Sequence, residues 1–324
     1  MTARERPFVA APYPGIIRVT HDIPFPGLKH VHTYLADGPG GGLVLVDTAL
    51  GGGESLDRIE QTIAWLGRDI TDLERIVLTH CHPDHIGLAS VLQERSGAPV
   101  VCHPNVRTGF ELMQTPDRWQ AVTDHYAEHG RETEDVSARF FLFPMPETFE
   151  FVEPGDVLRL ADGEWEVHYT PGHEVGHIAL HRAADGVLLS GDTLLRSITP
   201  HVGYTIDPPD PLGQFLDSLA LLASLDPKVV LAGHGRVFAE GAERAQAIRW
   251  HHRQRLKRIE EVLARHGPMT ALDTARRLFD RELRDFIERL ALAETLSHLE
   301  YLRLRERAVR ERVDGLWVYS LPSR

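Results

Sequence analysis

Four side chains that can bind metal ions stand close together in one short segment. Residues 80–85 read HCHPDH and contain His80, His82, Asp84 and His85. Imidazole nitrogens and carboxylate oxygens are ligands that zinc and similar cations take. In a tight loop, His80 and His82 can point to one position while Asp84 and His85 reach a second position nearby. The segment therefore predicts a two-metal site; a cluster of surface or capping histidines is the alternative.

Three further candidate ligands follow, each shortly after an apolar run. His173 stands in TPGHEVGH, Asp192 in SGDT and His234 in AGHG. Each alone is weak, because a histidine beside a glycine is more often a turn residue than a ligand. Together they occur in the order and context that a site at one edge of a sheet requires. The predicted ligand set is His80, His82, Asp84, His85, His173, Asp192 and His234.

The segments that must position these residues alternate between strand-like and helix-like patterns. Strands are expected at residues 15–19, 31–35, 43–46, 75–79, 98–102, 157–160, 165–169, 178–181, 187–190 and 229–231. Helices are expected at residues 54–66, 88–94 and 212–225. Such alternation predicts an α/β layered core.

Two regions depart from this alternation. Residues 105–147 carry apolar side chains at helical intervals and predict a helical insertion, which either caps the site or packs as surface helices. After residue 240, helices are expected at 240–266, 271–279, 282–291 and 293–306, and a strand at 316–320. Gly267 and Pro268 should stop the first of these helices. The chain is thus divided into residues 1–241 and a small winged-helix-like domain, residues 242–324.

The charge is uneven along the 324 residues. The formal net charge is −12, but residues 242–324 hold 18 Lys and Arg against 13 Asp and Glu. The acidic balance disfavours a nonspecific nucleic-acid coat protein and a protein that binds anionic membranes. An apolar stripe from Leu283 to Leu302 predicts the core of the tail or its packing on the main domain, with a homodimer interface as the alternative.

Cysteine usage and hydropathy bear on the compartment. Cys81 and Cys102 are the two cysteines, too few for a disulfide framework, which suggests reducing surroundings. No apolar run resembles a signal peptide or approaches the roughly 20 residues that span a bilayer. We therefore expect a cytoplasmic protein that does not bind membranes.

These motifs resemble those of the metallo-β-lactamase superfamily, and most of all its glyoxalase-II-like hydrolases and the β-lactamase-like proteins with a C-terminal winged helix. The resemblance covers residues 16–240 and, more loosely, the tail. It implies a four-layer αββα sandwich with the metal site at one edge. By the family pattern, His80, His82 and His173 hold one metal, Asp84, His85 and His234 hold the second, and Asp192 bridges both. Asp47, in LVLVDT, would support the site from behind.

The resemblance implies hydrolysis by a hydroxide that bridges two divalent metal ions, with zinc favoured and iron or manganese also compatible. Asp84 is the predicted catalytic residue, since it would hold both its metal and the attacking hydroxide. Cys81 fills a variable slot of the motif and is not expected to be a nucleophile.

The favoured substrate is a small ester, thioester or lactone. The alternative is phosphodiester cleavage of RNA, motivated by the basic tail and by endoribonuclease relatives with a similar tail. It ranks second because interleaved aromatic and basic residues are lacking. An iron-dependent oxygenase on the same scaffold ranks lower still.

Other histidines carry weaker expectations. His177 lies either behind the site or at the end of a core strand. His201, with Arg196 and Tyr204, lines the substrate pocket or belongs to an exposed loop. His251 and His252 are expected on a solvated helix face. No role is assigned to His103, His125 or His129.

Overall fold

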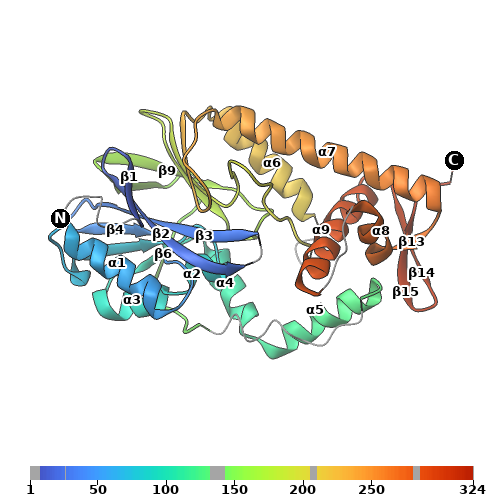
Figure 1. The fold of residues 1–324 in the computed structure, drawn as a ribbon, viewed down its shortest axis with the longest axis horizontal. Coiled ribbons are helices and arrows are strands. Elements are labelled where there is room, and N and C mark those ends of the chain that lie inside the picture. The colour runs from blue at the N-terminus through green and yellow to red at the C-terminus, as the bar shows by residue number, and fades with distance from the viewer. Residues whose placement is uncertain (1–7, 26, 132–142, 205–209, 280–284, 324) are drawn as a thin grey trace.

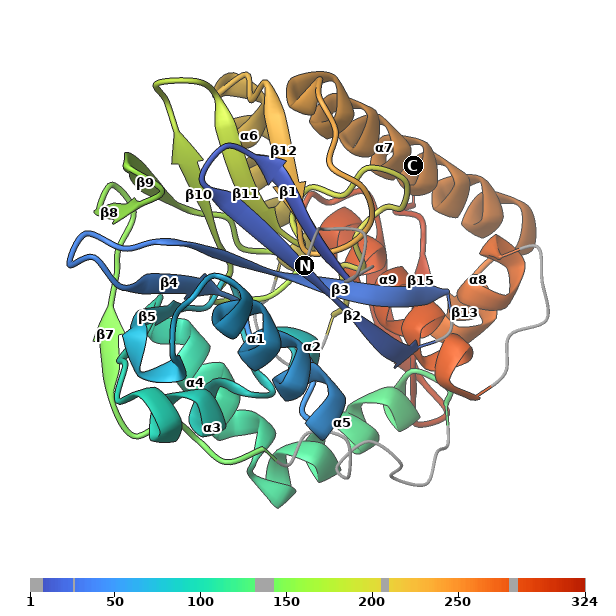
Figure 2. The same ribbon diagram turned by 60° about the vertical axis from the view of Figure 1, so that its left-hand side comes forward.

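The computed structural model describes residues 8–25, 27–131, 143–204, 210–279 and 285–323. Two β-sheets pack face to face, and helices cover the outer face of each (Figure 1). Figure 2 shows the two sheets from the side, with the blue and green first sheet below the yellow-green second sheet. The predicted four-layer α/β sandwich is therefore confirmed.

The two sheets hold the strands in nearly sequential order. The first sheet runs β1 (Val9–Tyr13), β2 (Ile16–Phe25), β3 (Leu28–Asp37), β4 (Leu43–Val46), β5 (Leu73–Val77), β6 (Val100–Cys102), β7 (Phe149–Phe151). The second runs β12 (Val229–Ala232), β11 (Val187–Gly191), β10 (Ile178–Arg182), β9 (Gly163–Tyr169), β8 (Val157–Leu160). Strands β4 to β7 pair in parallel, and so do β11 and β12.

Strand β4 illustrates how the sequence specifies the layers. Its side chains alternate between the two faces of the sheet. Leu43 and Leu45 pack with the helices on the outer face, whereas Val44 and Val46 pack between the sheets. The outer helices on this side include α1 (Gly53–Trp65) and α3 (Ala89–Ser96), with the 3₁₀ turn Ile70–Asp72 between them. Because β4 is buried on both faces, its four residues are all apolar.

The outer face of the second sheet is covered by α6 (Pro211–Ser224) and then by the C-terminal part of the chain. Phe215 of α6 belongs to one hydrophobic cluster with Leu188 and Val230 of the sheet and with Leu296 and Tyr319 near the C-terminus. The predicted boundary at residues 241 and 242 therefore crosses a continuous core. The division into two domains remains a prediction.

The C-terminal part contains the helices α7 (Gly241–His266), α8 (Ala271–Leu278) and α9 (Asp285–Arg303). A small sheet with the order β13 (Met269–Thr270), β15 (Leu316–Ser320), β14 (Val309–Val313) completes it. Gly267 ends α7 with a φ of 79°, which glycine adopts without steric cost. The two helices predicted at 282–291 and 293–306 are one helix, because the apolar face of α9 continues through residues 291–293. Among the described residues, none of the helices has the length and apolar character of a bilayer-crossing segment.

The predicted insertion contains two helices, α4 (Pro104–Met113) and α5 (Pro116–Glu128), before residues 132–142, which lie outside the described ranges. Helix α4 packs on the first sheet through Val106 and Phe110. Helix α5 runs away from the sandwich toward β14 and β15 (Figure 1). Its Glu128 accepts hydrogen bonds from Arg312 at 2.9 Å and from the indole of Trp317 at 3.2 Å. The described part of the insertion thus joins the sandwich to the C-terminal part.

The shared hydrophobic cluster should make the chain unfold as one cooperative unit. Leu296→Ala removes a fully buried side chain of α9 and should lower the free energy of unfolding by about 2–5 kcal/mol. Leu221→Ala, at a half-exposed position of α6, should cost less than about 1 kcal/mol. Urea unfolding of both variants measures the difference. Equal, small losses would show that the cluster does not join the two parts.

A buried histidine should make the fold sensitive to acid. His21 is fully buried beside Thr33, and burial lowers its pKa to about 3. Since an unfolded histidine titrates near 6.5, its contribution to stability is complete above that pH and is lost as pH falls toward the folded pKa. Between pH 6 and 4 the metal-free wild type should lose about 1.4 kcal/mol per pH unit more than His21→Gln. Urea unfolding at several pH values measures the slopes, with His266→Gln as the surface control; equal slopes would refute the assignment.

Candidate metal centre

The structure brings all seven predicted ligands together at one edge of the sandwich. Each lies in a loop or helix start that follows a strand, where side chains are free of the sheet ladder. The strands and the ligands that follow them are β5 with His80, His82, Asp84 and His85, β9 with His173, β11 with Asp192, and β12 with His234. Asp84 and His85 lie on the single turn α2 (Pro83–Ile86), which Pro83 begins.

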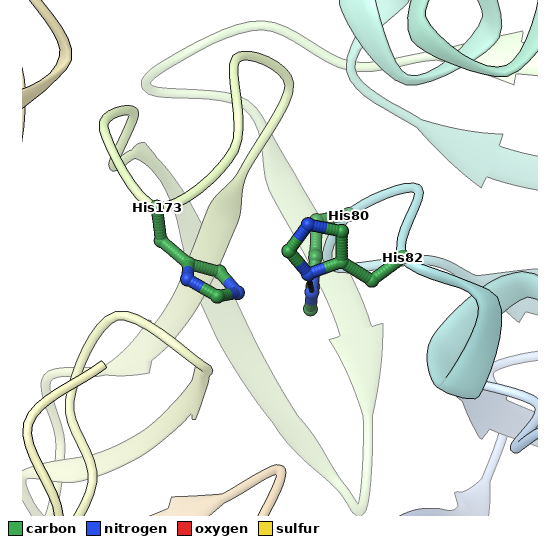
Figure 3. A group of neighbouring side chains, drawn as sticks. All are labelled: His80, His82 and His173. Carbon is green, nitrogen blue, oxygen red and sulfur yellow. Dashed lines mark hydrogen bonds between the residues drawn. The ribbon is translucent and has the colours of Figure 1, made fainter. Parts of the chain in front are cut away.

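His80, His82 and His173 form a first group. Their ring nitrogens lie within 4.8 Å of one another, and His80 Nε2 is 3.0 Å from His82 Nδ1. Figure 3 shows the rings of His80 and His82 next to each other, with that of His173 facing them, and the three ring centroids lie 4.6–5.1 Å apart. Nitrogen ligands at 2.0–2.1 Å from a tetrahedral zinc are about 3.4 Å apart. The spacing therefore suits one cation.

Asp84, His85 and His234 form a second group, in which His234 Nε2 is 3.4 Å from Asp84 Oδ2. Asp192 lies between the two groups. Its Oδ1 is 3.6 Å from His85 Nε2, and its Oδ2 is 3.0 Å from His234 Nε2 and 3.7 Å from His173 Nε2. One carboxylate thus faces both positions.

The second ring nitrogen of three ligands is held by a group that can only accept a hydrogen bond. The pairs are His85 Nδ1 with Asp47 Oδ2 at 2.8 Å, His173 Nδ1 with the His201 carbonyl at 2.7 Å, and His234 Nδ1 with the His30 carbonyl at 2.7 Å. Nδ1 must therefore carry a hydrogen, so Nε2 is the nitrogen that can face a cation. These are the partners that orient metal-binding imidazoles.

Asp47 anchors the HCHPDH loop from behind, as predicted. Besides His85 it accepts hydrogen bonds from the main-chain N–H of Thr79 at 2.8 Å and from the Thr79 hydroxyl at 2.9 Å. The Thr79 oxygen in turn lies 3.0 Å from His80 Nδ1. One buried carboxylate therefore orients His80 and His85, a ligand from each group.

The residues fit a bound metal by a test that involves no family pattern. Fifteen buried side-chain polar atoms of the described residues have no hydrogen-bond partner, and four of them gather at this one site: His85 Nε2, His173 Nε2, His234 Nε2 and Asp192 Oδ1. Burying polar atoms without partners is costly. Because all four atoms face the two ligand groups, divalent cations would satisfy them.

The pKa shifts indicate neutral rings in the first group and an ionised Asp192 between the groups. Burial and the neighbouring imidazoles lower the pKa of His80, and burial lowers that of His82 and His173. Neutral rings of this kind are the ligand form. Burial opposes the charge of Asp192, yet His234 and His85 hold its pKa well below the usual value. It is thus an ionised carboxylate.

Strand β3 holds the loop of His234. The main-chain N–H of His32 donates to the Gly233 carbonyl at 2.8 Å, and its ring Nε2 donates to the Gly235 carbonyl at 2.6 Å. The Tyr34 hydroxyl donates to the Ala232 carbonyl at 2.6 Å. These contacts join the two sheets next to the ligand.

Two residues near the ligands have supporting positions. His177, whose position the sequence left open, lies behind the site, where its Nε2 accepts from the main-chain N–H of Asp192 at 3.0 Å. Glu174 was missed because an acid beside His173 has no distinctive spacing. It is buried next to Cys81, and burial raises its pKa to about 6. Burial and Glu174 raise the pKa of Cys81 well above its usual value, which agrees with its exclusion as a nucleophile.

The remaining predictions have mixed outcomes. Arg196 is exposed, and His201 is one-third exposed. His201 was considered for its side chain, but it holds His173 through its carbonyl, which no sequence pattern reveals. The solvated face expected for His252 is wrong: the ring is fully buried against His298, with 3.0 Å between ring nitrogens, because α9 covers this side of α7.

Comparison with protein families gives two matches. The family described as "Metallo-beta-lactamase superfamily" matches residues 26–234. A second, "Metallo-beta-lactamase-like, C-terminal domain", matches residues 256–322. Together they cover both the sandwich with its candidate metal centre and the C-terminal elements.

Two similar proteins match nearly the whole chain, and a third matches part of it. "Probable metallo-hydrolase YqjP" of Bacillus subtilis is 26% identical over 323 residues, covering 94% of this chain and 97% of its own. The crystal structure of a metallo-beta-lactamase family protein from Thermus thermophilus has a TM-score of 0.86 at 35% identity, covering 96% and 100% of the two chains. A hydroxyacylglutathione hydrolase of Maricaulis maris is 32% identical over 106 residues, 30% of this chain and 40% of its own.

The role of Asp47 in orienting the ligands can be tested without changing any ligand residue. Asp47→Asn removes the charge that holds His85 and Thr79 and should weaken metal binding about 10–100-fold. Chelator competition measures the affinity. Asp57→Asn, at an exposed position of α1, is the matched control and should bind metal like the wild type. Unchanged affinity in Asp47→Asn would show that Asp47 does not orient the ligands.

Proposed function

Because the chain belongs to the metallo-β-lactamase superfamily and is a metal-dependent hydrolase, we propose that it works with two divalent metal ions at the edge of the sandwich. The observation that carries the proposal is the convergence of seven side chains into groups whose ligand atoms lie within 4.8 Å. Four of these residues, His85, His173, His234 and Asp192, each present a buried polar atom without a hydrogen-bond partner. The superfamily's chemistry and this geometry agree.

The proposed ligands divide between two positions. His80, His82 and His173 hold one ion, Asp84, His85 and His234 hold the other, and Asp192 contacts both. Five imidazoles and two carboxylates suit zinc best, and iron or manganese also accept such a set.

The residues divide the chemical work between them. Bound there, the cations would supply Lewis acidity, which would lower the pKa of a water molecule to about 7 and polarise the substrate's oxygen. Asp84 is a ligand on the short turn α2 and is 7% exposed, so one of its oxygens can face the attacking water. We assign it the role of orienting that water and accepting its proton. Asp47 and the carbonyls of His30 and His201 keep the rings in the ligand tautomer.

The proposed substrate is a small ester, thioester or lactone. The TPGHEVGH and GDT segments are similar to those of the thioester-cleaving branch, and the chain is partly similar to a protein named for hydrolysing hydroxyacylglutathione. The net charge of −12 favours a small substrate over a polyanion such as RNA. This glyoxalase-II-like assignment rests on similarity and charge, whereas the metal chemistry rests on geometry.

We also propose that residues 242–324 are a winged-helix-like domain. Support comes from the separate family match at 256–322 and from a hairpin, β14 and β15, that follows the helices. Exposed arginines are frequent in this part, and a homodimer interface through it remains a prediction.

The proposed function predicts metal-dependent turnover that depends on Asp84. Chelated protein should lose hydrolysis of acyl thioesters, aryl esters and lactones, and two equivalents of zinc should restore it. Asp84→Asn should lower kcat at least about 100-fold, because it loses a ligand and a proton acceptor. Steady-state assays on the three substrate panels measure both effects.

The outcomes separate reaction type from substrate. Asp124→Asn, on the exposed side of α5, is the control and should leave kcat unchanged. Cleavage of single-stranded RNA without ester or thioester turnover would reject the substrate class and keep the metal chemistry. Full activity in chelated protein would reject the metal chemistry itself.

A further inference from the structure

Helix α9 of the C-terminal part lies against the loop that follows Asp192. The main-chain N–H of Tyr204 donates to the Ala293 carbonyl at 2.9 Å. A Cβ atom at Gly203 would lie only 2.8 Å from His201 Nε2 and 3.5 Å from the Ala293 Cβ. Residues 201–204 are thus packed on α9.

A partly buried ion pair fixes the same contact. Glu294 of α9 accepts a hydrogen bond from Arg255 of α7 at 2.5 Å, and its other oxygen lies 3.7 Å from His201 Nδ1. Burial opposes the charge of Glu294, but His201 and Arg255 lower its pKa to about 2. The carboxylate is therefore ionised at neutral pH. It links α7, α9 and the 201–204 loop.

That loop also holds a proposed metal ligand. The His201 carbonyl accepts the hydrogen bond from His173 Nδ1 at 2.7 Å. The partners of His80, His85 and His234 are residues of the first sheet and its loops: Thr79, Asp47 and the His30 carbonyl. Among the ligand rings with a described partner, His173 is the one whose support comes from a loop packed on the C-terminal part.

We propose that Glu294 is a positioning residue for the metal centre: held by Arg255, it fixes the 201–204 loop, whose His201 carbonyl sets the orientation of the His173 ring. The inference rests on the proposed ligand set. It gives the C-terminal part a defined role, because helices outside the αββα sandwich complete the position formed by His80, His82 and His173. A carbonyl that moves by a few tenths of an ångström turns the ring that donates to it.

Metal binding in matched variants tests the inference. Glu294→Gln keeps the shape of the side chain and removes its charge. Glu288→Gln is the control, because Glu288 lies on the same helix, is similarly buried and pairs with Arg131 and Arg276 away from the site. Cobalt(II) titration, followed by visible absorption and chelator competition, reports each of two equivalents. Glu294→Gln should bind one equivalent about tenfold more weakly and with an altered spectrum, whereas Glu288→Gln should match the wild type.

Two further measurements separate positioning from stability and from the ligand set. The melting temperature of the metal-free variants reports a purely structural effect, which would leave the cobalt spectrum unchanged. Glu294→Asp keeps the charge and should recover affinity to within about threefold of the wild type. If Glu294→Gln does not fold, Arg255→Gln replaces it, because it removes the partner that holds Glu294 and should weaken the same equivalent. Wild-type affinity and spectrum in the folded variant that breaks the Arg255–Glu294 pair would overturn the proposal. A wild-type protein that binds fewer than two equivalents would instead reject the ligand set.

Discussion

Buried imidazole nitrogens and carboxylate oxygens that face one another without hydrogen-bond partners are the constraint on which this structure depends. His85, His173, His234 and Asp192 each present such an atom at the edge of the sandwich. The other ring nitrogen of each of these histidines is held by Asp47 or by a main-chain carbonyl, so the rings cannot turn away to find partners. An arrangement of this kind is costly in a protein without ligands and is stabilised when cations bind. The site is therefore preorganised for metal, and hydrolysis follows from that preorganisation.

The sandwich brings these atoms together because several strands end at the same edge. Apolar strands such as β4 and β11 are buried on both faces and leave polar residues only at their ends. Contacts from β3 to the loop of His234 keep the two sheets in register beside the ligands. The C-terminal helices extend the same support from the other side, since one hydrophobic cluster joins them to the second sheet. Packing of the C-terminal helices thus reaches the sheet that carries His173 and Asp192 at its strand ends.

The sequence predicted what is encoded locally and missed what depends on distant contacts. HCHPDH, GDT and AGHG identified the ligands because residue type and spacing are visible in a short segment, and apolar runs identified most of the strands. Strands β2 and β3 are longer than predicted because polar residues such as Asp22 and His30, which are partners across the ladder, interrupt the apolar pattern without interrupting the strand. The burial of His252 and the roles of the His30 and His201 carbonyls depend on residues 28 to 204 positions away. Every residue has a carbonyl, so no pattern marks those that orient a ligand.

The central claim is that two cations sit between the seven side chains, and anomalous X-ray diffraction from crystals of the metal-loaded protein tests it most directly. The account predicts two anomalous peaks within about 4 Å of each other. One should lie among His80, His82 and His173, the other among Asp84, His85 and His234, with Asp192 contacting both. Peaks elsewhere, or metal-loaded crystals in which these side chains contact no cation, would contradict the account.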